Sequence, residues 1–267
     1  MAKLVQGANT RRKSILGIVL VSLIVYLFSC SISFGSSEGF CLKTANFIQY
    51  TKELYSELGF SESVISFQAF STSVTAYYIA LGKNLIKKPY LLTIIDYTQP
   101  SEKERFFVID LKKRKILFKE LVAHGKRSGK RYAQYFSNKP GSLKSSIGLY
   151  ITLATYTGSH GYSLRLKGLE KGFNDNAQRR NIVIHGAWYV DRKMAKYLHW
   201  LGRSCGCPAL SLNSVKKVID TIKDGSALYI YYPLKNYIQT SRYLNLQKAA
   251  LVFNQKIAKT TALMRPY

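Results

Sequence analysis

Cysteine and histidine residues in the second half of the chain have the types and spacing for covalent chemistry. Cys205 and Cys207 follow His185 by about twenty residues. The thiolate is the form of cysteine that attacks, and a neighbouring imidazole can take the thiol proton or lower the thiol pKa. A single Cys–His pair gives only weak support for an enzyme, because such pairs often arise by chance.

Glycine follows three of the four histidines, namely His124, His160 and His185. Such a glycine removes Cβ crowding and lets the backbone turn sharply, which helps to aim an imidazole into a cleft. Glycine also separates Cys205 from Cys207. A cysteine next to a glycine is accessible to a bulky acyl donor, and nearby backbone N–H groups can help to stabilise an oxyanion. The fourth histidine, His199, lies in a helical pattern and is expected to be structural or at the surface.

The elements that must position these residues follow from the spacing of apolar side chains. Helical spacing predicts helices over residues 47–58, 64–81, 194–201, 215–222 and 246–257. Alternation and short apolar runs predict strands over residues 90–97, 105–111, 116–122, 147–154, 181–184 and 226–232. His185 therefore stands at the end of a short buried strand.

Composition limits the class of partner. The chain has 267 residues, 47% of them hydrophobic, with 40 Lys+Arg against 14 Asp+Glu and a net charge of +26. The apolar content is too high for a disordered basic tail, and the charge indicates an anionic partner such as nucleic acid, a phospholipid surface or an acidic polymer. Residues 121–267 hold 24 of the basic residues and five of the acidic ones. The basic character therefore belongs to the half that carries Cys207 and His185.

The N-terminal segment resembles a secretory signal peptide. Basic residues 11–13 precede an almost wholly apolar run from Ile15 to Phe34, and small residues then suit cleavage before Ser36. The alternatives are a permanent membrane anchor, since the run is about the ~20 residues that span a bilayer, and lipidation at Cys30. All three place the rest of the chain outside the cytoplasmic membrane, which argues against nucleic acid as the partner. After cleavage, Cys41, Cys205 and Cys207 remain, and at least one of these three thiols must stay free within the chain.

Several ordered motifs resemble the L,D-transpeptidases with a YkuD-type catalytic domain, and most closely the murein L,D-transpeptidase catalytic-domain branch. They are residues 184–187 (Ile-His-Gly-Ala) and 202–209 (Gly-Arg-Ser-Cys-Gly-Cys-Pro-Ala), with further matches at 122–125, 136–138, 156–164 and 168–176. The resemblance is strong over residues 121–232 and fainter over 90–120. It implies a YkuD-like β-sandwich catalytic domain. Together with the helical spacing near both ends of the chain, the expected fold is α+β, mostly β, with short helices, a helical N-terminal segment before this domain and a C-terminal helix after it.

The resemblance also implies the chemistry. Cys207 corresponds to the nucleophile and His185 to its general base, which a backbone carbonyl such as that of Gly186 would orient. Cysteine-dependent acyl transfer on peptidoglycan stem peptides would release a terminal D-amino acid through a thioester, and a second amine would complete a crosslink. Support of the oxyanion or of the loop is expected from Ser204, Cys205, Gly206 and Gly186.

Substrate contacts are expected from Arg203, His124, His160, Trp188 and Tyr189. Each has an alternative: the two histidines could fix loops, and the two aromatic residues could belong to the core. The broader family often has Arg or Asn two residues after the cysteine, where this chain has Ala209. A substrate carboxylate would then be bound by Arg203, Arg179 or Arg180, or by no arginine at all.

The expected organisation is a signal peptide or anchor over residues 1–35, a helical segment over 36–89, a catalytic domain over 90–233 and a basic amphipathic tail over 234–267. We expect an exported bacterial protein, periplasmic or facing the cell wall, with membrane association through residues 15–34 as an option. No cofactor, metal or nucleic acid is expected.

Three other functions stay open. Water in place of an amine would make the protein an L,D-carboxypeptidase. His124, His160, His185 and Cys207 could instead bind zinc in a murein amidase, although their spacing matches no recognised zinc motif. The chain could also be a catalytically inactive, basic wall-binding protein.

Overall fold

The computed structural model describes residues 39–263, with side chains to residue 258. Residues 39–45 belong to a separate unit from residues 46–263. The expected signal segment and Cys30 lie outside the described residues. No helix in the described part of the chain is long and apolar enough to cross a membrane.

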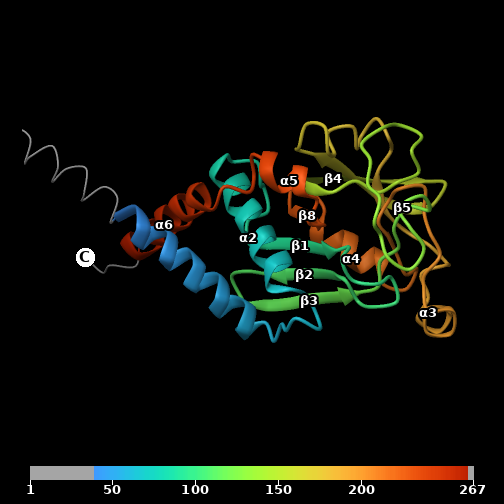
Figure 1. Cartoon of the computed structure of the whole chain (residues 1–267), viewed down its shortest axis with the longest axis horizontal. Coiled ribbons are helices and arrows are strands. Elements are labelled where there is room, and N and C mark those ends of the chain that lie inside the picture. Colours follow the sequence, from blue (N-terminus) through green and yellow to red (C-terminus); the bar gives the residue numbers. More distant parts are fainter. Residues whose placement is uncertain (1–38, 264–267) are drawn as a thin grey trace, which may run out of the picture. The chain divides into compact units, whose positions relative to one another are not determined.

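Eight strands join one continuous sheet in the order β3-β2-β1-β8-β4-β5-β6-β7. Figure 1 shows this sheet with helices packed on it. The strands are β1 (Leu91–Asp96), β2 (Phe106–Asp110), β3 (Lys115–Glu120), β4 (Gly148–Gly158), β5 (Gly161–Gly168), β6 (Val183–Gly186), β7 (Ala209–Leu210) and β8 (Ala227–Tyr231).

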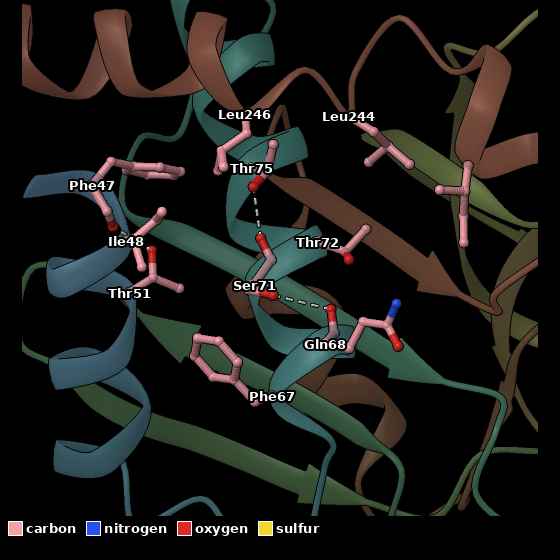
Figure 2. A pocket seen from close by; sticks show the side chains of 11 residues that line it. Phe47, Ile48, Thr51, Phe67, Gln68, Ser71, Thr72, Thr75, Leu244 and Leu246 are labelled. Atoms are coloured by element: carbon pink, nitrogen blue, oxygen red, sulfur yellow. Dashed lines mark hydrogen bonds between the residues drawn. The ribbon is translucent and has the colours of Figure 1, made fainter. Parts of the chain in front are cut away.

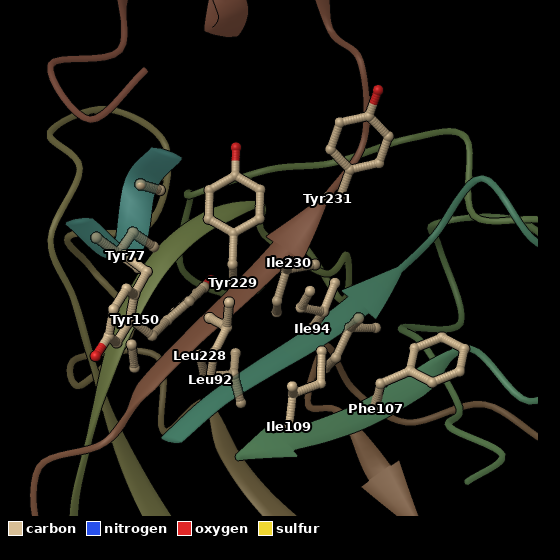
Figure 3. Close-up of a cluster of buried hydrophobic side chains, with 14 of the residues drawn as sticks. Tyr77, Leu92, Ile94, Phe107, Ile109, Tyr150, Leu228, Tyr229, Ile230 and Tyr231 are labelled. Carbon is tan, nitrogen blue, oxygen red and sulfur yellow. The ribbon is translucent and has the colours of Figure 1, made fainter. Parts of the chain in front are cut away.

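Residues far apart in the sequence meet at the centre of this sheet. β1 pairs in parallel with β8, so that Ile94 lies opposite Tyr229, and β4 pairs antiparallel with the other edge of β8. Figure 3 shows the side chains of β1, β2 and β8 gathered in one buried cluster that includes Ile94, Phe107 and Ile230. Burial of this apolar surface is the main stabilising contribution.

β4 and β5 form a long hairpin that reaches toward β6. Its turn is only two residues long, because Gly158 pairs with Gly161. Gly161 has φ +70°, a conformation that glycine adopts without strain. The hairpin therefore places His160 at its tip.

Helices complete the fold. α2 (Phe67–Gly82) begins at Ser66, whose side chain accepts a hydrogen bond from Ala69 N, and it packs on β1, β8 and α6. Residues 39–57 are also helical. The remaining helices are α3 (Arg192–Leu198), α4 (Val215–Ile222), α5 (Lys235–Thr240) and α6 (Leu246–Leu263). The predicted α+β, mostly β architecture with its N-terminal and C-terminal helices is confirmed.

A cavity of about 370 Å³ lies in the helical part of the molecule, and Figure 2 shows the side chains that line it. Residues 47–51, α2 and the start of α6 line it, with Phe47, Phe67 and Leu246 among them. The hydroxyl groups of Thr51, Ser71 and Thr75 in its lining donate to backbone carbonyls of their own helices. None of the sequence-predicted site residues lines this cavity, so it is separate from the chemistry considered below.

Glu170, in the loop after β5, links the sheet to α5. Its Oε1 accepts hydrogen bonds from Leu149 N at 2.7 Å and from the Tyr237 hydroxyl at 2.6 Å, and its Oε2 accepts one from Ser241 Oγ. Burial raises the pKa of Glu170, and these hydrogen bonds counteract that rise. The carboxylate is thus a structural group that satisfies several buried donors.

We predict that Glu170→Ala lowers the free energy of unfolding by about 2–4 kcal/mol, because it leaves the buried donors of Leu149 and Tyr237 unpaired. Glu170→Gln keeps a carbonyl acceptor and should lose less than about 1 kcal/mol. Urea denaturation at pH 7 measures both. Equal losses for the two variants would contradict this role for Glu170.

Candidate active site

His185 is the third residue of β6, and β6 determines its direction. The imidazole is 2% exposed, and its Nδ1 lies 2.9 Å from the Gly186 carbonyl oxygen. A carbonyl only accepts, so Nδ1 carries the proton and Nε2 remains a free base. This contact with the Gly186 carbonyl fixes the direction of the His185 ring.

The charge state of His185 follows from its surroundings. Burial lowers the pKa of His185, the Gly186 carbonyl raises it, and His160 lowers it. The His160 ring stacks on the His185 ring, with centroids 4.4 Å apart and planes 20° apart. A neutral imidazole at neutral pH can accept a proton, which is the state that a general base requires.

Cys207 lies in the loop just before β7, the strand that pairs with the one that carries His185. β6 and β7 pair in parallel, with His185 opposite Ala209. The half-buried thiol of Cys207 donates a hydrogen bond to the Asn181 carbonyl, with Sγ and O 3.4 Å apart. No hydrogen bond among the described residues joins Sγ to His185. The thiol thus lies against the residues that lead into β6, and its proton is directed at a backbone oxygen.

Opposing effects act on the thiol pKa. Burial raises the pKa of Cys207, as does the neighbouring Cys205. The Val183 backbone N–H and the Arg180 guanidinium lower it, because both stabilise the thiolate.

The three residues before Cys207 form a tight turn around one hydroxyl. Ser204 Oγ donates to the Cys207 carbonyl at 2.6 Å and accepts from Gly206 N at 3.0 Å. Gly206 has φ +131°, and a Cβ there would lie 2.9 Å from the Lys144 carbonyl oxygen. Ser204 and Gly206 therefore hold the backbone of this turn in place. The Gly206 N–H is already bonded, which leaves the N–H groups of Cys205 and Cys207 as the candidate oxyanion donors.

Residues 123–126 hold this loop on both sides of the thiol. Ala123 N donates to Ala209 O at 2.9 Å, Ser204 N donates to His124 O at 3.0 Å, and Lys126 N donates to Ser204 O at 2.8 Å. These bonds accompany isolated bridges from Ala123 to Ala209 and from Gly125 to Ser204.

Gly125 and Ser145 allow the close contact beneath the loop. A Cβ on Gly125 would lie 2.6 Å from the Leu143 carbonyl oxygen and 3.0 Å from Gly206 Cα, so only glycine fits. Ser145 Oγ accepts from Gly125 N at 3.0 Å and donates to the Gly206 carbonyl at 3.1 Å. Sequence reasoning missed Ser145, since a serine in a polar stretch carries no signal for such a bond.

His124 lies behind the site and not at its surface. Its side chain is fully buried, with Nδ1 2.7 Å from Arg105 Nη2 and Nε2 3.3 Å from the Gly129 carbonyl. The guanidinium can only donate, so Nδ1 accepts and Nε2 carries the proton. Burial, together with Arg105, lowers the pKa of His124 to about 3. These contacts fit the alternative of a loop-fixing histidine, and the burial does not fit a substrate contact.

Arg203 is engaged in internal contacts. Its Nη1 donates to the carbonyls of Lys126 and Gly129, each at 3.2 Å, and its guanidinium lies over the Trp200 ring. It therefore stabilises the segment that follows residues 123–126, which in turn hold residues 202–209, the cysteine loop.

Trp188 and Tyr189, the two aromatic residues expected to contact substrate, differ in their exposure. Trp188 is 72% exposed, and its ring meets that of Tyr189 edge-on, with centroids 5.8 Å apart. Burial raises the pKa of Tyr189 to about 12, and the nearby thiols of Cys207 and Cys205 contribute. Tyr189 is thus half-buried against a small apolar cluster that includes Val190 and Leu201, while Trp188 faces solvent.

The remaining predicted residues are placed as follows. His160 is exposed at the tip of the β4–β5 hairpin, and His199 is exposed at the end of α3. Cys41, Cys205 and Cys207 are all free thiols. Within residues 39–263, no group of three or more His, Cys, Asp or Glu side chains could hold a metal ion. Of the four residues of the zinc alternative, His160 and His185 stack on each other, but no three of the four form such a group.

A family model described as the L,D-transpeptidase catalytic domain (YkuD type) matches residues 61–231. No curated protein sequence matches the chain. Among solved structures, an L,D-transpeptidase from Mycobacterium smegmatis is 13% identical, with a TM-score of 0.35, over 54% of this chain and 59% of that one. The helical cell shape determining protein of Campylobacter jejuni is 16% identical, with a TM-score of 0.39, over 70% of this chain and 65% of that one. The matched parts are thus less than two thirds of those proteins.

The buried His124 makes a testable contribution to acid stability. Its pKa is about 3 in the folded protein against 6.5 for the free side chain. This contribution is complete above pH 6.5 and is lost as the pH falls through 3, because the unfolded chain binds the proton first. We predict that His124→Gln, which keeps an acceptor for Arg105, reduces the acid-induced loss of unfolding free energy at pH 4 by about 2–4 kcal/mol.

Urea denaturation between pH 7 and pH 4 measures this effect. His199→Gln is the matched control, since His199 is exposed, and it should show the same acid sensitivity as the unsubstituted protein. Equal acid sensitivity for His124→Gln and His199→Gln would contradict the assignment of a buried neutral His124.

Proposed function

Since this chain belongs to the L,D-transpeptidase catalytic-domain family, we propose that it is a cysteine acyltransferase acting on peptidoglycan stem peptides, with Cys207 as nucleophile and His185 as general base. One observation carries the residue assignment. β6 presents a neutral, carbonyl-oriented imidazole on the strand beside the loop of Cys207.

The reaction begins with proton transfer. His185 Nε2 is the free nitrogen of the ring and would take the thiol proton, which Cys207 now directs at the Asn181 carbonyl. The thiol must turn from Asn181 toward Nε2 for this step. Catalytic hydrogen bonds are often loose in the absence of substrate and tighten when it binds.

The thiolate would then attack the carbonyl on the L-centre side of the bond to the terminal D-amino acid. The tetrahedral oxyanion needs preorganised donors. The backbone N–H groups of Cys205 and Cys207 fit this need, because neither donates a described hydrogen bond, whereas the Gly206 N–H is used by Ser204. Protonation by His185 lets the D-amino acid leave as an amine, and a thioester remains on Cys207.

The acceptor decides the product. A second stem-peptide amine gives a crosslink and makes the protein a transpeptidase, whereas water gives a carboxypeptidase. Attachment of another protein to the wall would pass through the same thioester. We propose transpeptidation, which is the activity that names the family.

The surroundings of the site suit an acidic wall polymer. The chain carries a net charge of +26, and residues 121–267 hold most of the excess basic charge. A positive field attracts a carboxylate-bearing peptide strand and raises the rate of encounter. Wall remodelling would require export, which agrees with the proposed signal segment at residues 15–34.

We predict that Cys207→Ser and His185→Gln each reduce D-alanine release from a disaccharide tetrapeptide by at least about 100-fold, since each removes a step on which the thioester depends. Cys41→Ser is the matched control, because Cys41 is an exposed free thiol, and it should retain full release. Chromatographic quantification of D-alanine measures all three, with binding to murein sacculi as a test of folding.

Two outcomes would refute the proposal. Unchanged release by Cys207→Ser would exclude Cys207 as nucleophile. An unsubstituted, folded and reduced protein that binds sacculi and releases no D-alanine would support the inactive wall-binding function instead.

A further inference from the structure

The guanidinium of Arg180 lies half-buried beside the cysteine loop without an acidic partner among the described residues. It donates four hydrogen bonds, all to neutral acceptors. The acceptors are Ser137 O at 2.6 Å, Lys144 O at 2.5 Å, Ser142 Oγ at 3.2 Å and Ser146 Oγ at 3.3 Å. The positive charge is therefore held in place and not neutralised.

This guanidinium adjoins the residue that precedes the nucleophile. A Cβ built on Gly206 would lie 3.3 Å from Arg180 Nη2 and 2.9 Å from Lys144 O. Arg180 and the Lys144 carbonyl are therefore both packed against the backbone of Gly206. Ser145, next to Lys144, donates to the Gly206 carbonyl. By binding residues 137–146, Arg180 thus fixes the segment on which the Gly206 turn rests.

We propose that Arg180 is a positioning residue of the acyltransferase: it fastens residues 137–146 under the Gly206 turn and keeps a cation beside the thiol of Cys207. The inference rests on the proposed function, in which that thiol is the nucleophile. It assigns Arg180 a role different from the grip on a substrate carboxylate, because four of its five N–H groups are already used inside the protein.

The charged and titratable groups around the thiol show why this cation matters. They are Arg180, Cys205, Tyr189, Tyr97 and, on the neighbouring strand, His185. Arg180 is the cation in this set, and it lowers the pKa of Cys207, while burial and Cys205 raise it. His185 is held neutral by its own burial. Without Arg180, burial would therefore leave the thiol protonated to a higher pH.

The experiment measures the ionisation of the thiol directly. In the full-length chain, Cys30, Cys41 and Cys205 are replaced by serine, so that Cys207 is the only cysteine. The rate of alkylation by iodoacetamide is followed from pH 6 to pH 11, and it reports the thiolate fraction without requiring turnover. D-alanine release is measured in parallel.

We expect Arg180→Met to raise the apparent thiol pKa by about one unit, and to slow alkylation at pH 7 about tenfold, which is the low end of the effect of a nearby opposite charge. Arg180→Lys should keep the thiol pKa of the parent, since it keeps the charge. It should still lose D-alanine release, because an ammonium cannot replace the planar fork that binds residues 137–146. Arg179→Met is the matched control for net charge, as Arg179 is the exposed neighbour, and it should leave the thiol pKa unchanged.

Equal thiol pKa values for Arg180→Met and Arg179→Met would overturn the inference. If Arg180→Met does not fold, as judged by near-ultraviolet circular dichroism, Arg180→Lys decides: a thiol pKa raised by a unit in that variant overturns it, and the parent value supports it. Full D-alanine release by Arg180→Lys would overturn the positioning role. Failure of the proposed function is distinct, since it would appear as D-alanine release that survives Cys207→Ser.

Discussion

Backbone hydrogen bonds from residues 123–126 clamp the cysteine loop at Ser204 and Ala209, one on each side of Cys207. These hydrogen bonds require the backbone of residue 125 to pack directly against the backbones of Leu143 and Gly206. A Cβ at position 125 would collide with the Leu143 carbonyl and press on Gly206. Fixed backbone positions cost nothing to reorganise during the reaction, which is what preorganised stabilisation of a transition state requires. The same hydrogen bonds fix the position of Cys207 relative to His185, because Ala209 is the first residue of β7, which pairs with β6.

Two cations, the buried Arg105 and the half-buried Arg180, support this arrangement, and neither is paired with a carboxylate in the described hydrogen bonds. Arg105 is fully buried and donates to Val122 O, Gln99 O and His124 Nδ1. Arg180 serves residues 137–146 in the same manner. Backbone carbonyls thus solvate charges that would otherwise be costly to bury. Both guanidinium groups thus keep their positive charge inside the half of the catalytic domain that carries the cysteine loop or the segments packed on it.

Local pattern was enough to predict much of the fold. Clean alternation at Ile147, Leu149 and Ile151 predicted β4, and the apolar run before His185 predicted β6. Strand β5 was not predicted, although its buried Leu164 and Leu166 alternate with exposed Arg165 and Lys167; the signal was present and short. The two-residue β7 and the six-residue α5 are too brief for a periodic signal.

In the candidate site, too, local motifs were informative and tertiary contacts were not predictable. The motifs pointed to the cysteine loop at residues 202–209, and the resemblance led us to expect a backbone carbonyl such as that of Gly186 beside His185. The burial of His124 could not be predicted, because it depends on Arg105, which lies 19 residues earlier in the chain, just before β2, and the contact of Arg180 with Lys144 spans 36 residues. Such contacts depend on tertiary packing. The most direct measurement is covalent labelling of the reduced protein with a carbapenem, followed by tandem mass spectrometry that separates Cys205 from Cys207 on their shared tryptic peptide. The proposed function predicts one adduct, on Cys207, whose formation requires His185. An adduct on Cys205, or none in folded protein, would contradict it.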